Sequence, residues 1–238
     1  MLKSALLRFP VAYEWVERFR DRAYLQRAVK AGSYAQHGED LELLRLLRAR
    51  GATGPYVDVG CNHPFKLSNT YLLYAQGYRG VCIDPLPRYQ ALYQRWRPQD
   101  RFVRTAIGEV EGELTFHEFE SDVLSTLDPQ LAALYAQQGY RLRRQSGVRV
   151  ARLDTVLDEA GVRGPISLLS IDIEGHELPA LRSIDLSRWQ AALICLEVAT
   201  ADGHRNQDAL DYVTGQGYEI TLDLGLNIIL GRTTATGA

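Results

Sequence analysis

The chain has 238 residues, of which 46% are hydrophobic and 24% are charged, and its formal net charge is -2. This balance is typical of a globular protein with one catalytic-sized domain and a full core. The slightly negative charge gives no general attraction to phosphate backbones, so nucleic acid is not an expected partner. No apolar run approaches the roughly 20 residues that span a bilayer, and we expect a cytoplasmic protein.

Residues 1–32 are expected to form a helical arm outside the main domain. Apolar residues recur at roughly helical spacing from Leu2 to Tyr24, with a break expected at Pro10. Seven basic and three acidic residues occur before Ala31, so the arm is basic and the rest of the chain is acidic. We expect the arm to dock on the main domain or on a second subunit of a homo-oligomer. Weak peripheral contact with a membrane surface remains a second interpretation.

From residue 33 to residue 232 the pattern changes to strands that alternate with helices. The expected strands are short apolar runs bounded by glycine and proline, at residues 56–60, 80–84, 102–107, 166–172 and 192–198. Helices are expected at residues 40–50, 68–76, 87–96, 154–160 and 178–184. Runs of this kind are typical of parallel strands covered on both faces. The alternation predicts an α/β fold with a doubly wound, Rossmann-like sheet and helices on both faces.

Two segments interrupt or end this alternation. Residues 113–153 contain an expected strand, loop, helix and second strand, too long for a simple crossover, and we expect this insertion to form part of a substrate lid. After a helix at residues 206–214, strands at 218–222 and 227–230 predict an antiparallel hairpin. Residues 233–238 are expected to be a disordered tail.

The first two expected strands carry acidic residues that indicate a nucleoside site. Asp58 lies inside the first strand and would need a ligand or another partner to satisfy its charge, while Gly60 at its end allows close backbone approach. Asp84 ends the second strand, where an acidic side chain binds ribose hydroxyls in this kind of fold. A dinucleotide site would require G-x-G-x-x-G after the first strand, and this chain has a single glycine there.

Several separated motifs resemble those of the FkbM family of methyltransferases. In chain order they are SYAQHGED from Ser33, VDVGCNHP from Val57, SNT from Ser68, IDP from Ile83, STL from Ser125, SIDIEG from Ser170 and LE from Leu196. Their order and spacing are similar to the family pattern from about residue 33 to residue 200. Two small departures are Ala35, where the family often has serine, and Cys61, which replaces a common alanine.

The resemblance implies a class I methyltransferase fold, with a mostly parallel sheet and an antiparallel C-terminal hairpin strand, and S-adenosylmethionine as cofactor. It implies that Asp84 binds the ribose and that the loop after Asp58 lies near the methionine part. It also suggests that Gln36, Glu39 and Asp40 form a helix start that closes over the cofactor, although Gln36 and Asp40 could equally cap the following helix. The expected cofactor-binding residues are Gln36, Asp58, Gly60, Asn62, Ser68, Asn69, Asp84 and Asp172.

Transfer of a methyl group to an alcohol requires a general base or a metal ion, because an alcohol is a poor nucleophile at neutral pH. The expected catalytic residues are Asp172, Glu174 and His176, which follow the fourth strand at the edge where open α/β sheets bind ligands. Asp172 or His176 would act as the base, and Glu174 would orient it or bind substrate. An acid-rich helix start is the alternative, and it alone would explain Glu177.

Other residues are candidates for contact with a metal or the acceptor. Asp172 and Glu197, at the ends of neighbouring strands, would together suit Mg²⁺, although no metal is required by the pattern. Expected substrate contacts are His63, Ser125 and Glu197. Four arginines between residues 141 and 149 would either recognise an anionic acceptor or form a solvated face.

The sequence thus predicts an S-adenosylmethionine-dependent O-methyltransferase. The resemblance suggests a hydroxyl of a saccharide or natural product as the acceptor, and a glycan is our preferred class. Two alternatives remain open, a non-catalytic nucleoside-binding protein and an NAD(P)-dependent oxidoreductase. Methylation of a nitrogen would use the same cofactor pocket with a less demanding base.

Overall fold

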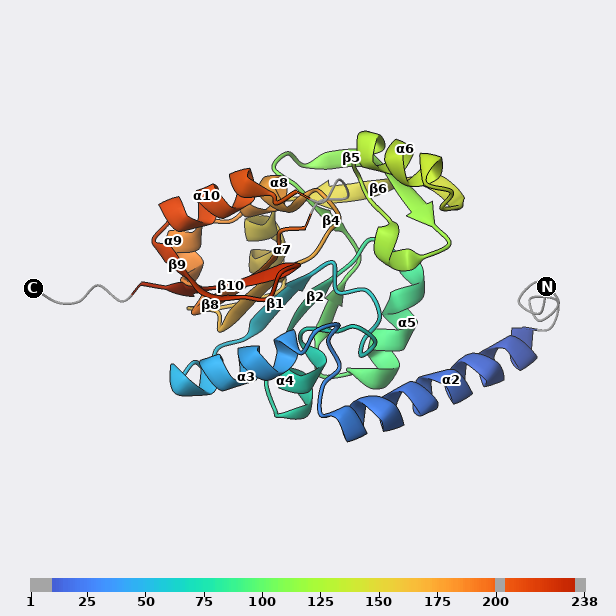
Figure 1. Ribbon diagram of the computed structural model, residues 1–238, viewed down its shortest axis with the longest axis horizontal. Coiled ribbons are helices and arrows are strands. Elements are labelled where there is room, and N and C mark those ends of the chain that lie inside the picture. The colour runs from blue at the N-terminus through green and yellow to red at the C-terminus, as the bar shows by residue number, and fades with distance from the viewer. Residues whose placement is uncertain (1–9, 200–203, 234–238) are drawn as a thin grey trace, which may run out of the picture.

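A computed structural model of the chain describes residues 10–199 and 204–233, with side chains from residue 20 onward. Seven strands form one sheet, shown in Figure 1. From edge to edge they are β3 (Arg101–Val103), β2 (Gly80–Ile83), β1 (Tyr56–Val59), β7 (Leu168–Ile171), β8 (Leu193–Glu197), β10 (Asn227–Arg232) and β9 (Tyr218–Asp223). The first five are parallel, and β10 runs antiparallel to β8 and β9. The predicted Rossmann-like sheet with its antiparallel C-terminal hairpin is confirmed.

Helices cover both faces of the sheet because alternate strand residues bury opposite sides. Val57 and Val59 face a core layer formed by α7 (Leu153–Glu159), α8 (Glu177–Leu181), α9 (Leu186–Trp189) and α10 (Gln207–Gly215). Tyr56 faces the other layer, formed by α3 (Glu39–Ala49), α4 (Tyr71–Ala75) and α5 (Pro87–Trp96). The four residues of β1 are all buried, as are those of β7. This two-sided burial explains why these strands are continuous apolar runs, interrupted only by functional or bonded polar residues.

The expected strand at residues 102–107 is wrong as a single element. Residues 101–103 form β3 in the main sheet, whereas β4 (Ala106–Ile107) pairs with β6 (Leu142–Ala151) in a separate three-stranded sheet. Thr105 lies between β3 and β4, where the chain passes from one sheet to the other, and its Oγ1 donates a hydrogen bond to the carbonyl of Arg149 at 3.0 Å. The backbone therefore changes sheets inside one apolar run, which strand periodicity alone does not reveal.

The insertion between β4 and β7 consists of β5 (Gly112–Phe119), the 3₁₀ turn η1 (Asp122–Leu124), α6 (Pro129–Gln137) and β6. Asp128 caps α6 by accepting hydrogen bonds from the amides of Gln130 (2.7 Å) and Leu131 (3.2 Å). The strand expected from residue 148 begins at Leu142, because its polar, mostly exposed first half pairs with β5 without an apolar pattern. Figure 1 shows the insertion above the carboxyl ends of the parallel strands.

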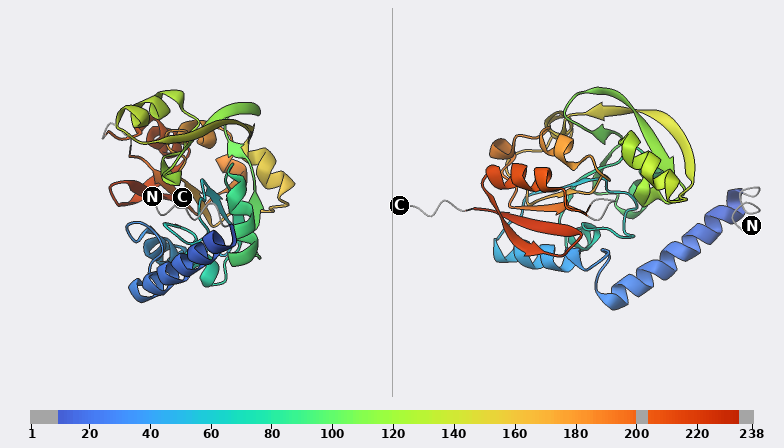
Figure 2. Two further views of the ribbon diagram at one scale, coloured as in Figure 1. Left: turned by 90° about the vertical axis from the view of Figure 1, so that its right-hand side faces the viewer. Right: turned by 45° about the horizontal axis from the view of Figure 1, so that its top comes forward.

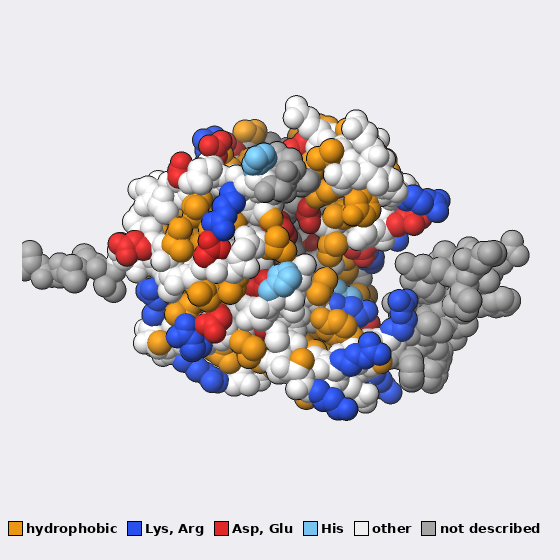
Figure 3. Space-filling model, in the orientation of Figure 1, with side chains coloured by type: hydrophobic (Ala, Val, Ile, Leu, Met, Phe, Trp, Pro, Cys, Tyr) orange, Lys and Arg blue, Asp and Glu red, His pale blue; other side chains and the backbone are white. Residues whose placement is uncertain are grey.

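The N-terminal helix α2 (Pro10–Ala31) runs away from the domain, as the right-hand view of Figure 2 shows. Its C-terminal end docks on the body, where Ala28 is buried and the Tyr24 hydroxyl donates to the carbonyl of Tyr34 at 3.2 Å. Arg22, Arg27 and Lys30 are exposed on it, and Figure 3 shows basic side chains along this helix. The helix begins at Pro10, and the residues before that expected break lie outside the described ones, as does nearly all of the expected tail.

Among the described residues, no helix combines the length and apolarity needed to cross a membrane.

Candidate active site

A cavity of about 290 Å³ opens at the carboxyl ends of β1, β2, β7 and β8. This is the edge at which parallel α/β sheets bind ligands, because several loops and helix starts converge there. The insertion supplies one wall through residues 122–125. Every predicted cofactor residue lines this cavity: Gln36, Asp58, Gly60, Asn62, Ser68, Asn69, Asp84 and Asp172.

Asp84 stands at one side of the cavity, directly after β2. Its carboxylate accepts hydrogen bonds from the amides of Leu86 at 2.8 Å and Asn62 at 3.2 Å. Burial raises the pKa of Asp84 to about 7, although these two amides stabilise the charged form. Because two carboxylate oxygens offer about four acceptor positions, lone pairs remain for ligand hydroxyls.

The end of β1 requires glycine at position 60 because the backbone of the loop after β7 packs directly against it. The φ of Gly60 is +79°, and a Cβ there would lie 1.8 Å from the carbonyl oxygen of Asp172. Only glycine therefore allows the loop after β1 to pack closely against the loop after β7. This contact brings the two halves of the cavity together.

Asp58 lies at the floor of the cavity and has hydrogen-bonding partners inside the protein. The Thr70 hydroxyl donates a hydrogen bond to its carboxylate, and the same hydroxyl accepts one from Arg97 at 3.0 Å. Burial raises the pKa of Asp58 to about 6, while the Arg97 charge opposes that shift. A ligand is thus not needed to satisfy this carboxylate, and its place is structural support as well as cavity lining.

Arg97 was missed by sequence reasoning. It is fully buried, and it donates to Asp100 at 2.6 Å and to the hydroxyl of Tyr56 at 2.7 Å. Its guanidinium also lies 5.1 Å from the centre of the Tyr93 ring. A single arginine at the end of an amphipathic helix carries no motif, so only the three-dimensional structure reveals this anchor.

Opposite Asp84, three carboxyl groups form an acidic cluster, defined as Asp172, Glu174 and Glu197. One oxygen from each lies within 4.8 Å of the others. Burial raises the pKa values of both Asp172 and Glu197, and repulsion from Asp172 raises that of Glu197 further, which favours a proton held by this pair. The structure therefore brings together the predicted catalytic and metal-binding carboxylates.

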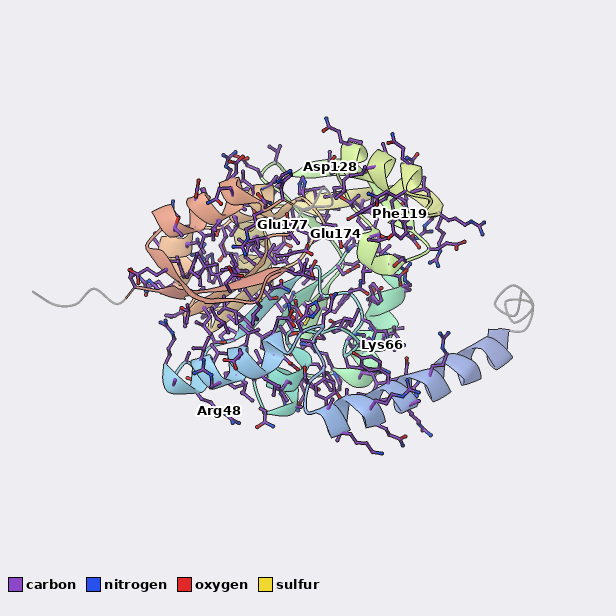
Figure 4. All side chains as sticks on the ribbon, viewed as in Figure 1. Arg48, Lys66, Phe119, Asp128, Glu174 and Glu177 are labelled. Atoms are coloured by element: carbon purple, nitrogen blue, oxygen red, sulfur yellow. The ribbon has the colours of Figure 1, made fainter. Side chains whose placement is uncertain are left out.

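Glu174 is held by the insertion. The Tyr135 hydroxyl of α6 donates to its Oε2 at 2.6 Å, and the Thr126 hydroxyl donates to its carbonyl at 2.7 Å. Its φ of +52° is unusual for a residue with a side chain. Burial and the nearby Asp172 raise its pKa to about 8. Figure 4 shows Glu174 between the main sheet and the insertion that carries Asp128 and Phe119.

His176 and Glu177 have different surroundings despite being adjacent. His176 lines the cavity at the start of α8, and burial lowers the pKa of its imidazole, which keeps the ring neutral at pH 7. Glu177 is buried and accepts hydrogen bonds from the amides of Ile173 (3.3 Å) and Gly175 (3.0 Å). Glu177 thus stabilises the loop, as the helix-start alternative expects.

The remaining polar lining residues are partly bonded within the protein. The Ser68 hydroxyl accepts from the Tyr71 amide at 3.1 Å, and the Ser125 hydroxyl accepts from the Phe119 amide at 3.1 Å. Asn69 donates to the Ser170 hydroxyl at 3.5 Å. Gln36 is exposed at the rim.

Asp40 is buried and accepts hydrogen bonds from Ser33 (2.6 Å) and the Tyr34 amide (2.7 Å). It therefore fixes the segment before α3, whose residue Gln36 reaches the cavity. Glu39 accepts from the His37 amide at 2.7 Å and from Asn227 at 2.9 Å. Both acids hold the helix start in place through protein contacts.

His63 is not among the residues that line the cavity. Its Nε2 lies 3.5 Å from Asp21 of α2, and its ring packs edge-on against Phe65. The arginines of β6 also face protein partners, since Arg143 and Arg144 lie 2.9 and 2.7 Å from the buried carboxylate of Glu118. These contacts favour a structural role for that arginine run.

The mostly parallel sheet with its antiparallel last strand β10, covered by helices on both faces, has the Rossmann-like arrangement of a class I methyltransferase. Residues 58–220 match the model of the methyltransferase FkbM domain, which covers more than half of the chain. The chain belongs to the FkbM methyltransferase family, and is an S-adenosylmethionine-dependent methyltransferase.

Solved structures with a similar arrangement include a TehB-like SAM-dependent methyltransferase from Corynebacterium glutamicum, with 14% identity and a TM-score of 0.45 over 93% of this chain and 97% of that one. A second is the 1,6-didemethyltoxoflavin-N1-methyltransferase of Burkholderia thailandensis, with bound S-adenosylhomocysteine, at 13% identity and a TM-score of 0.41 over 98% of this chain and 89% of that one. No curated protein matches the chain.

Proposed function

We propose that the protein transfers a methyl group from S-adenosylmethionine to a hydroxyl of a saccharide or a related polyhydroxylated natural product. The observation that carries this proposal is the position of the acidic cluster in the same cavity as Asp84. One side of the cavity offers a ribose acceptor, and the other offers groups that can bind a hydroxyl and take its proton. A nucleoside-binding protein without activity has no evident use for the second side.

The residues on the Asp84 side fit the cofactor. Asp84 has unused acceptor positions for the ribose hydroxyls, and Asn62, whose φ is +46°, presents its backbone to the same carboxylate. A single glycine after β1 suits a cofactor without phosphates, since no row of bare amides is needed. When bound, S-adenosylmethionine supplies the methyl group from its sulfonium centre, and its sulfur would leave as the neutral thioether of S-adenosylhomocysteine.

On the acidic side, Asp172 is proposed as the general base. In this proposal Glu197 carries the proton held by the pair, and the Asp172 carboxylate accepts the proton of the attacking hydroxyl while the new oxygen–carbon bond forms. Neutral His176 is the second group that can accept this proton. Glu174 is proposed to bind the acceptor through its carboxyl group, which Tyr135 holds in place.

The charges around the cavity support a neutral acceptor. Six acidic side chains line it, whereas its basic side chains among the described residues are His176 and Lys66. Lys66 already pairs with Asp21 at 2.6 Å. An acceptor rich in hydroxyls can donate hydrogen bonds to these carboxyl groups, while a uronate or phosphate would be repelled.

The insertion is proposed to act as the substrate lid. Val123, Leu124 and Ser125 contribute to the cavity wall, and the insertion bonds to Glu174 from two sides. We propose that the N-terminal arm, of which the structure describes α2, has a role separate from that of the lid. Its basic helix is a candidate for a second subunit or an anionic membrane surface.

A panel assay tests the proposal. The purified chain would be incubated with methyl-labelled S-adenosylmethionine and neutral methyl glycosides, and in parallel with the matching uronates and amino sugars. We expect label in the neutral glycosides as acid-stable ethers, and at least about tenfold less in the uronates. Label mainly in the amino sugars would indicate N-methylation.

Calorimetric measurement of ligand binding distinguishes a methyltransferase from an NAD(P)-dependent oxidoreductase without knowledge of the acceptor. We expect S-adenosylhomocysteine to bind and NAD not to bind. Binding of neither ligand would overturn the proposed cofactor, whereas binding of S-adenosylhomocysteine without transfer to any acceptor would favour a non-catalytic role.

A further inference from the structure

One buried hydroxyl joins the Asp84 side of the cavity to the insertion. The Tyr89 hydroxyl of α5 lies within hydrogen-bond distance of Asn62 Oδ1 and of Asp122 Oδ2, the latter at 2.8 Å. Tyr89 is 2% exposed, so water does not readily supply an alternative partner. A phenol has one proton, and it can donate fully to only one of these two oxygens.

Each oxygen belongs to a different functional part of the molecule. Asn62 is in the loop that contacts Asp84, because its amide donates to that carboxylate at 3.2 Å. Asp122 begins η1, which forms a wall of the cavity. Asp122 is also 2.7 Å from Arg88, whose other terminal nitrogen lies 2.6 Å from Glu118 in β5. Tyr89 and Arg88 are thus the links from α5 to the lid.

We propose that Tyr89 is a positioning residue that couples occupation of the ribose side to closure of the insertion. The inference rests on the proposed function, because it requires a ligand hydroxyl beside Asn62. A ligand hydroxyl that donates to Asn62 Oδ1 releases the Tyr89 proton to Asp122. Without ligand the hydroxyl is shared between the two oxygens, and when it donates fully to Asp122 that charge-assisted bond strengthens, so ligand binding tightens the contact between α5 and η1.

The coupling gives the enzyme an order of binding. The insertion closes most firmly after the cofactor side is filled, and the acceptor then binds between the acidic cluster and the ordered lid. By linkage, closure of the insertion strengthens cofactor binding by the same factor. A lid held only by Arg88 would close equally well with or without the cofactor.

Hydrogen exchange measured by mass spectrometry tests this coupling without knowledge of the acceptor. Exchange would be followed in the full chain, with and without saturating S-adenosylhomocysteine, for peptides covering residues 60–62 and 84–86 and for peptides covering residues 120–127. In the wild type we expect both regions to be slowed, and the second by about fivefold or more, as for a typical coupling between sites. In Tyr89→Phe, the first region should still be protected and the second should lose its ligand-dependent protection.

Two further variants keep the result clear. Asp122→Asn removes the charge that draws the Tyr89 proton and should give the same loss, so it replaces Tyr89→Phe if that variant does not fold. Tyr140→Phe removes a half-exposed phenol in the same insertion and should behave as the wild type. Wild-type-like coupling in both Tyr89→Phe and Asp122→Asn would overturn the inference. Absence of ligand binding in the wild type would instead overturn the proposed cofactor.

Discussion

The two sides of the cavity satisfy their carboxylates in different ways. Asp84 accepts hydrogen bonds from the backbone amides of Leu86 and Asn62, which favour its charged form although burial raises its pKa to about 7. In the acidic cluster of Asp172, Glu174 and Glu197, burial raises the pKa of all three carboxyl groups, and the charge of Asp172 raises those of Glu174 and Glu197 further. Ribose binding requires hydrogen-bond acceptors held in a fixed position, whereas proton transfer requires a carboxyl group that gains and loses a proton during the reaction. The difference separates a binding side from a chemical side.

The largest effect should come from the chemical side. Asp172→Asn retains shape but cannot take a proton, so we expect methyl transfer to an acceptor found in the panel to fall by about 10²–10⁴-fold. Binding of S-adenosylhomocysteine should change little, because ribose is held by Asp84. Turnover and calorimetry of the same sample provide the measurement. A loss of binding equal to the loss of turnover would show that the two sides are not separate.

The floor that supports both sides should depend on Arg97. Arg97→Met leaves Asp100 and Asp58 buried without their cation, and loss of one partner of a buried pair costs about 3–5 kcal/mol of unfolding free energy. Arg95→Met is the matched control, since Arg95 lies on the same helix and is exposed. Urea denaturation of the two variants measures the difference. Equal stability of the two would mean that Arg97 does not support the floor.

On the binding side, Asp84→Asn should weaken the affinity for S-adenosylhomocysteine by roughly 10- to 100-fold, because hydrogen bonds to a charged group contribute about 1.5–3 kcal/mol. The amide can still accept from the Leu86 backbone, so the loop should stay folded. Asp223→Asn changes a similar carboxylate that caps a turn by accepting from Gly225 at 2.9 Å. Calorimetry should find that Asp223→Asn binds S-adenosylhomocysteine with unchanged affinity. A comparable loss of affinity in both variants would contradict the assignment of Asp84 to the ribose.

The pH dependence of binding follows from the same residue. The pKa of Asp84 is raised to about 7, so the carboxylate that accepts ribose hydroxyls is present above this value and is lost as the pH falls through it. Affinity for S-adenosylhomocysteine should therefore decrease about tenfold from pH 8 to pH 6. Asp84→Asn should remove this dependence. A wild-type affinity that is flat over this range would exclude titration of Asp84.

The binding side was largely predictable from the sequence. Asp84 follows a recognisable strand, and parallel strands place their carboxyl ends along one edge of the sheet. The topology therefore predicted that Asp84 and Asp172 line the same cavity. The same reasoning located Glu197 at the end of β8, next to Asp172 after β7. It could not locate Arg97 or Tyr135, because each acts through partners distant in the chain and lies in no motif.

The insertion shows a second limit of prediction. Its strands were expected, but the division of residues 101–107 between two sheets was not, because both parts have the same apolar character. His63 followed the cofactor loop in sequence, yet a turn directs it toward Asp21 in α2. Adjacency in sequence is a weak guide to side-chain direction in loops, where no regular periodicity fixes it.

The smallest effect should come from a substitution of Glu197, which tests whether a shared proton or a Mg²⁺ ion offsets the repulsion between Asp172 and Glu197. Glu197→Gln replaces the proton that bridges to Asp172 with an amide donor, so methyl transfer should fall by less than about fivefold if a hydrogen bond is all that Glu197 provides. If Mg²⁺ is bound by Asp172 and Glu197, the amide is a poorer ligand, and the variant should require more Mg²⁺ while the wild type is inhibited by EDTA. Turnover of both proteins with EDTA and across a Mg²⁺ series distinguishes the two cases. We expect the first, because a proton shared by Asp172 and Glu197 already relieves their repulsion.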